Sequence, residues 1–171
     1  MKMLKKLLAI VLTGAMALTL LTACGGNAVT EKDIADAMND MAKAKGTNVT
    51  FTPRAAEREL AQKLAALSEK DWNITGGKLS EKVIEILGLN EANEESCFVW
   101  YGAVFADEIG TAGQAYNVMN NILSKNAVNA DKLEGEPADI RYIGTALGTM
   151  TYHGGKPTTV RIIVVTAPVK K

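Results

Sequence analysis

The first half of the chain carries apolar residues at the spacing of an α-helix in two long stretches, which predict two helices. The first follows Thr30, which with Asp33 resembles a capping box, and it ends at Gly46. The second starts at Pro53, a residue favoured in the first turn, with Thr52 as its cap. The inner faces are expected to be Ile34, Met38 and Met41 in the first helix and Ala56, Leu60, Leu64 and Leu67 in the second.

Three further segments have clear local signals. A short strand is predicted at 48–51, and a helix from Ser80 to Leu87 is stopped by Gly88. Another helix opens at Thr111, which forms a second capping box with Gln114. The apolar stripe of that helix comprises Ala115, Val118, Met119, Ile122 and Leu123.

The second half of the chain also contains three runs rich in β-formers. Residues Cys97–Ala106 carry no charge, which is typical of a strand covered on both faces. Residues Ile140–Thr151 and Thr158–Ala167 flank a loop with Gly154-Gly155, and this pattern predicts a hairpin. The expected fold is α/β in the broad sense (α+β): a three-layer α/β/α sandwich with a small mixed or antiparallel central sheet.

The start of the chain has the pattern of a secretory signal peptide. Lysines in Met1–Lys6 precede an uncharged stretch, Leu7–Thr22, that is shorter than the roughly 20 residues of a membrane-spanning helix. The stretch ends in Leu21-Thr22-Ala23-Cys24, which resembles the bacterial lipobox. That resemblance implies cleavage before Cys24, a diacylglycerol on the thiol of this cysteine and a fatty acid on its amine. The alternative is an ordinary signal peptide with a cysteine nearby.

We therefore expect a signal peptide at 1–23, a lipidated cysteine and tether at 24–30, and one globular domain at 31–171. The expected location is extracytoplasmic, on the cell membrane. The chain has 19 basic and 19 acidic residues, and the signal holds Lys2, Lys5 and Lys6 but no acid. The remainder is slightly acidic, which argues against a nucleic-acid partner and against a polybasic membrane-binding face.

The candidates for chemistry are few. With Cys24 lipidated, Cys97 has no partner for a disulfide, and it is expected to be a small buried hydrophobe. His153 is the only histidine, so zinc-ligand spacing is missing and neither a metal site nor a catalytic residue is predicted. Asp107 and Glu108 follow the most apolar strand, where a ligand crevice could lie. A solvated loop beside the start of a helix is the alternative for this pair.

Together with Tyr142 and His153, Asp107 and Glu108 form the possible groove of the domain. Trp100 and Phe105 are expected to pack in the core. No cofactor is expected beyond the covalent lipid on Cys24.

The order of these elements resembles the CAP superfamily, which includes cysteine-rich secretory proteins, antigen 5 and pathogenesis-related 1 proteins. The segments that carry the resemblance are 38–46, 59–65, 115–123, 139–148 and 160–165. The resemblance covers roughly 34–167 and implies a CAP-like domain. The sequence departs from the family in its functional signature, since the two histidines and two glutamates of the family pocket have no counterparts. The resemblance is therefore to a degenerate CAP domain.

Two functions follow from these patterns. The first is a membrane-anchored, non-catalytic binding module whose ligand is a peptide, a lipid, a glycan or another envelope protein. The second is a cell-envelope hydrolase or metal-dependent enzyme that uses Asp107, Glu108 and His153. The missing histidines favour the binding module.

Overall fold

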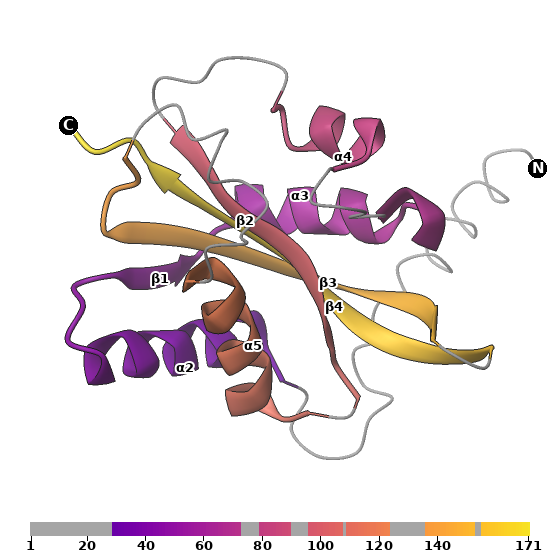
Figure 1. Ribbon diagram of the computed structural model, residues 1–171, viewed down its shortest axis with the longest axis horizontal. Helices are drawn as coiled ribbons and strands as arrows, with labels where there is room; N and C mark the ends of the chain where they lie inside the picture. Colours follow the sequence, from indigo (N-terminus) through magenta and orange to yellow (C-terminus); the bar gives the residue numbers. More distant parts are fainter. Residues whose placement is uncertain (1–28, 73–78, 90–95, 108, 124–135, 153–154) are drawn as a thin grey trace, which may run out of the picture. The chain divides into compact units, whose positions relative to one another are not determined.

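The protein is represented by a computed structural model (Figure 1), which describes residues 29–72, 79–89, 96–107, 109–123, 136–152 and 155–171. Residues Glu31–Lys171 form one compact unit. The elements in chain order are α2 (Glu31–Ala44), β1 (Thr50–Pro53), α3 (Ala55–Ala65), the 3-10 helix η1 (Glu69–Trp72), α4 (Glu81–Ile86), β2 (Ser96–Phe105), α5 (Thr111–Leu123), β3 (Ile140–Tyr152) and β4 (Lys156–Pro168).

The four strands form one mixed sheet in the order β1-β3-β4-β2. β3 and β4 are a long antiparallel hairpin, β2 is antiparallel to β4, and the short β1 runs parallel to β3. Gly155 has a φ of +79° in the turn of the hairpin, a conformation that glycine adopts at little cost. The predicted α+β class, the small mixed sheet and the hairpin are confirmed.

Alternate residues of β4 contact different helices. Val160, Ile162 and Val164 belong to a buried cluster with residues of α3 and α4, whereas the Arg161 side chain bonds to Gln114 of α5. Figure 1 shows α3 and α4 on one side of the sheet and α2 and α5 on the other. We call these sides the α3 face and the α5 face.

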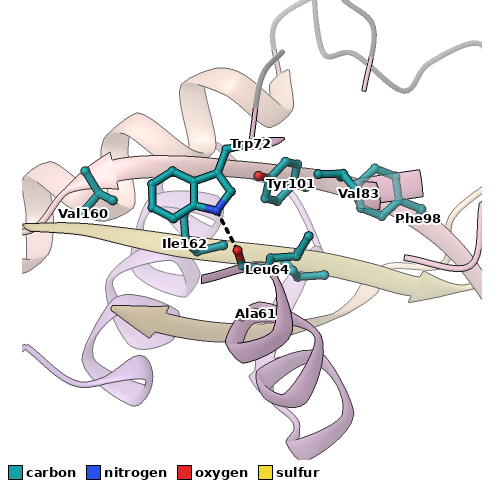
Figure 2. Packing of buried hydrophobic residues seen from close by; sticks show 9 residues of the cluster. Ala61, Leu64, Trp72, Val83, Phe98, Tyr101, Val160 and Ile162 are labelled. Atoms are coloured by element: carbon teal, nitrogen blue, oxygen red, sulfur yellow. Dashed lines mark hydrogen bonds between the residues drawn. The ribbon is translucent and has the colours of Figure 1, made fainter. Parts of the chain in front are cut away.

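The cluster on the α3 face is entirely apolar apart from the polar tips of its aromatic rings (Figure 2). The indole of Trp72 lies in this cluster, and its Nε1 donates a 2.6 Å hydrogen bond to the carbonyl oxygen of Leu64. This bond satisfies the one polar group of the indole, so the large ring is buried without an unpaired donor. The cluster comprises Ala61, Leu64, Trp72, Val83, Phe98, Tyr101, Val160, Ile162 and Val164.

A β-bulge distributes the aromatic side chains of β2 between the two faces. The register of β2 against β4 shifts between Phe98 and Trp100, at Val99. Without this shift, Phe98 and Trp100 would point to the same face, because side chains alternate along a strand. With it, Phe98 and Tyr101 both join the cluster on the α3 face. Trp100 pairs with Val165 on the α5 face, and its burial confirms the expected core position.

The start and the inner face of α3 differ from the prediction. Pro53 ends β1, in register with Ile143, and the helix begins at Ala55 with Arg54 as its N-cap. The edge position of β1 tolerates a proline, because an edge strand has one side without a ladder. The helix buries Glu57, Ala61 and Leu64, whereas the predicted inner residue Ala56 is exposed. The apolar spacing therefore predicted a helix here, but with a start two residues too early and without its buried carboxylate.

The two ends of α4 follow their local signals. The Ser80 hydroxyl accepts a 3.3 Å hydrogen bond from the Val83 amide at the start of α4, and Gly88 ends it with a φ of +65°. In α5, however, the predicted capping box is wrong. The Gln114 side chain donates to the Ile109 carbonyl and accepts from Arg161 instead of capping the helix. Among the described residues, no helix is long and apolar enough to cross a membrane.

Candidate functional site

A polar cluster lies on the α3 face where α3 begins. The carboxylate of Glu57 accepts hydrogen bonds from Nε and Nη2 of Arg54 in a two-pronged contact, at 2.5 Å for Nε. The Thr166 hydroxyl of β4 donates a further 2.7 Å bond to Glu57. Glu57 is only 1 % exposed, so these partners compensate for its removal from water.

The predicted site residue Tyr142 completes this cluster. Its ring lies under the Arg54 guanidinium, with 3.8 Å between Cζ and the ring centroid. Tyr142 stands opposite Thr166 in the β3–β4 ladder, which brings it beside the helix start. The Arg54 side chain remains 42 % exposed, and Nη1 takes part in none of the contacts above. The cluster therefore presents one edge of an immobilised guanidinium at the surface.

The ionisation of Glu57 and Arg54 is coupled through this contact. Burial raises the pKa of Glu57, but hydrogen bonds from Arg54 and Thr166 outweigh burial, so the net shift of its pKa is downward. The hydrogen bond to Glu57 raises the pKa of Arg54. Both side chains are charged at neutral pH, and the cluster is suited to hydrogen bonding rather than to proton transfer.

The backbone explains why the cluster forms here. The Arg54 amide donates a 3.0 Å bond to the Ile143 carbonyl, which continues the β1–β3 ladder by one residue before the chain turns into α3. A Cβ on Gly144 would lie 2.0 Å from backbone atoms of Glu57 and Arg58. A glycine is therefore needed for α3 to approach β3 this closely, and this approach brings Glu57 to Thr166.

Asp107 lies elsewhere on the sheet. It follows the end of β2, and its Oδ2 accepts a 3.1 Å bond from the Thr159 amide. Thr159 and Thr166 are separated by roughly 24 Å of β4 at the rise of an antiparallel strand. The structure thus places Asp107 and Tyr142 near opposite ends of β4 and does not bring them into one groove. Glu108 and His153 lie outside the described residues.

A second polar cluster is buried on the α5 face. Nε of Arg161 donates a 2.9 Å bond to Oε1 of Gln114, and one Nη donates a 3.3 Å bond to the Thr145 hydroxyl. Burial lowers the pKa of Arg161, and the negative charges of Glu31 and Asp33 oppose that shift. The sequence analysis missed this cluster. Its signal is a single charged residue within the otherwise apolar run 160–165 of β4, together with a glutamine beside the apolar stripe of α5.

Cys97 is buried, as the sequence predicts. Its thiol lies 3.8 Å from the Pro168 carbonyl, and burial raises its pKa, which disfavours the reactive thiolate. Burial also raises the pKa of Tyr101 to about 12, so its hydroxyl stays protonated. In the part of the chain that the structure describes, no group of three or more His, Cys, Asp or Glu side chains could hold a metal ion.

Comparisons of the chain with protein-family models, with curated proteins and with solved structures find no match.

Proposed function

We propose that the protein is an extracytoplasmic lipoprotein, anchored to the cell membrane through Cys24, whose domain is a non-catalytic binding module. The observation that carries the anchoring is the register of Leu21-Thr22-Ala23-Cys24 after a basic start and a short apolar stretch. Two acyl chains on one cysteine are sufficient for stable membrane attachment without a basic surface patch.

The exposed edge of the Arg54 guanidinium, which is stacked on Tyr142, supports a binding role. The guanidinium is held by Glu57 and stacked on an aromatic ring. Little side-chain entropy would therefore be lost when a ligand accepts hydrogen bonds from Arg54. The ligand is a peptide, a lipid, a glycan or another envelope protein. The enzymatic alternative receives less support, because the Asp107 carboxylate already accepts the Thr159 amide at the end of a strand.

Lipidation is tested by replacing Cys24. The Cys24→Ser protein should not incorporate a fatty-acid analogue in cells and should leave the membrane fraction, because serine lacks the thiol that accepts the diacylglycerol. Cys97→Ser is the matched control, since its side chain is buried in the domain, and that protein should still be labelled and sediment with membranes. If Cys24→Ser is labelled and sediments like the parent, the proposed anchoring is wrong.

A further inference from the structure

The first residue of α2, Glu31, connects three elements through one carboxylate. Oε1 accepts a 2.7 Å bond from Nη2 of Arg58 on α3, and Oε2 accepts a 2.7 Å bond from the Thr145 amide on β3. The Glu31 side chain is only 11 % exposed, whereas a second ion pair of α2, Lys32–Asp36, is largely exposed.

The Thr145 amide needs this partner because β1 is short. The β1–β3 pairing ends at Pro53 and Ile143, and the Arg54 amide takes the Ile143 carbonyl. The next amide of β3 that faces β1 belongs to Thr145, which lies beyond the last residue pair of the β1–β3 ladder. The Glu31 carboxylate thus takes the place of a strand carbonyl, as an acceptor that carries a negative charge.

The same contact extends into the interior of the α5 face. The Thr145 hydroxyl accepts from Arg161, which bonds in turn to Gln114 of α5. Glu31 is therefore joined to β3, α3 and, through Thr145, to the buried polar cluster. A helix start held in this way resists fraying, although the first turn of a helix is ordinarily its least stable part.

We propose that Glu31 is a latch that fastens the start of the folded domain and so fixes the length of the tether behind the lipid. This inference rests on the proposed lipidation of Cys24. Residues 24–30 can span at most roughly 25 Å when fully extended. Unwinding the first turn of α2 would add roughly 7 Å more, because each of its 3.6 residues gains about 2 Å on extension. The latch thus keeps the reach of the domain from its lipid anchor at the shorter of these two values.

Hydrogen exchange on the full-length lipoprotein in phospholipid vesicles tests the latch. In an α-helix the amides of residues 35–38 donate to the carbonyls of residues 31–34, so their protection reports whether the first turn stays folded. Glu31→Ala removes both contacts, and exchange at 35–38 should become about tenfold faster or more. Glu31→Gln keeps an acceptor for Thr145 but loses the ion pair, so its effect should be smaller. Asp36→Asn, which breaks the exposed pair, should leave these amides unchanged.

The length of the tether needs a separate measurement, because a stabilising residue alone would not change it. A donor dye on Lys63→Cys, an exposed site on α3, reports energy transfer to acceptors in the vesicle surface. Glu31→Ala should weaken the energy transfer. A chain with four glycines inserted after Gly26 has a longer tether by design, so its loss of energy transfer is the reference for the loss in Glu31→Ala. Amides of β4 should keep their protection in every variant.

Three outcomes overturn the latch. The first is that vesicle-bound Glu31→Ala has the same amide exchange at 35–38 and the same energy transfer as the parent. Glu31 then does not hold the helix start, and the lipidation proposal is unaffected. If the parent itself does not bind vesicles through Cys24, the tether has no anchor, and both proposals fail together. Loss of protection throughout β4 in both Glu31 variants would also refute the latch, because Glu31 would then be a residue on which the whole fold depends.

Discussion

The two faces of the sheet are stabilised by different interactions. On the α3 face, Val160, Ile162 and Val164 of β4 pack into a cluster of hydrophobic residues (Figure 2). On the α5 face, the same strand places Arg161 in the interior, where Gln114 accepts its hydrogen bond. Stability on the α3 face depends on the exclusion of water. On the α5 face, it depends in addition on every polar group keeping its partner.

The comparison also separates two buried charges. Glu57 is buried on the α3 face, and the positively charged guanidinium of Arg54 lies within hydrogen-bonding distance of its carboxylate. The Arg161 guanidinium donates to the side-chain amide of Gln114 and to the hydroxyl of Thr145. The negative charges of Glu31 and Asp33 favour its protonated form. A carboxylate with a cationic partner should respond to pH, whereas a guanidinium stays protonated in the accessible range.

The largest effect is expected from a charge placed on the α3 face. Val164→Asp would bury an unpaired carboxylate in the hydrophobic cluster, at a cost of several kcal/mol against a typical total stability of about 5–15 kcal/mol. The variant should lose cooperative thermal unfolding, measured by circular dichroism. Lys156→Asp, at an exposed position of the same strand, is the control and should melt cooperatively. Parent-like melting of Val164→Asp would show that this side of β4 is not covered.

A smaller effect is expected on the α5 face when one polar partner is removed. Gln114→Leu deprives Arg161 of its amide acceptor, and we expect a loss of about 1.5–3 kcal/mol in the free energy of unfolding. The control Asn117→Leu changes an exposed position of the same helix and should have little effect. Adding Arg161→Met to Gln114→Leu should restore part of the loss in urea titrations. An unchanged midpoint for Gln114→Leu would mean that the bond contributes nothing to stability.

The smallest effect should be the pH dependence contributed by Glu57. Its pKa in the folded protein is below the ordinary glutamate value of 4.5, so its contribution to stability is present above that value and is lost as the pH falls through the lowered pKa. Urea midpoints from neutral to acidic pH should fall less steeply for Glu57→Gln than for the parent. Thr166→Val, which removes one of the bonds to Glu57, should lie between them. If all three curves are parallel, the ionisation of Glu57 does not contribute to folding.

Elements with strong local signals could be predicted from the sequence. The uncharged run of β2 and the two runs around Gly155 became strands with bounds within two residues of those expected. Ser80 and Gly88 delimited α4, because a cap and a left-handed residue act on their immediate neighbours. The resemblance to the CAP superfamily rests on the residue pattern and stays a prediction.

The candidate site could be predicted only in part. Tyr142 was recognised as an aromatic that could line a groove, but its partners Arg54, Glu57 and Thr166 were not. Two of the four predicted groove residues, Asp107 and Tyr142, lie near opposite ends of β4. Residues that follow different strands meet only if the strand order and register bring them together, and neither property can be read from the spacing of apolar residues.

The sequence by itself determined most of the segments that are helices and strands, because that choice depends largely on side chains a few positions apart. Only the tertiary structure decided that α3 turns Glu57 inward, since the position of this helix is set by the close approach to Gly144. It also decided that a bulge at Val99 sends Phe98 and Trp100 to opposite faces. These features depend on partners far along the chain, and a buried charge is stable only where such partners compensate for its lost hydration.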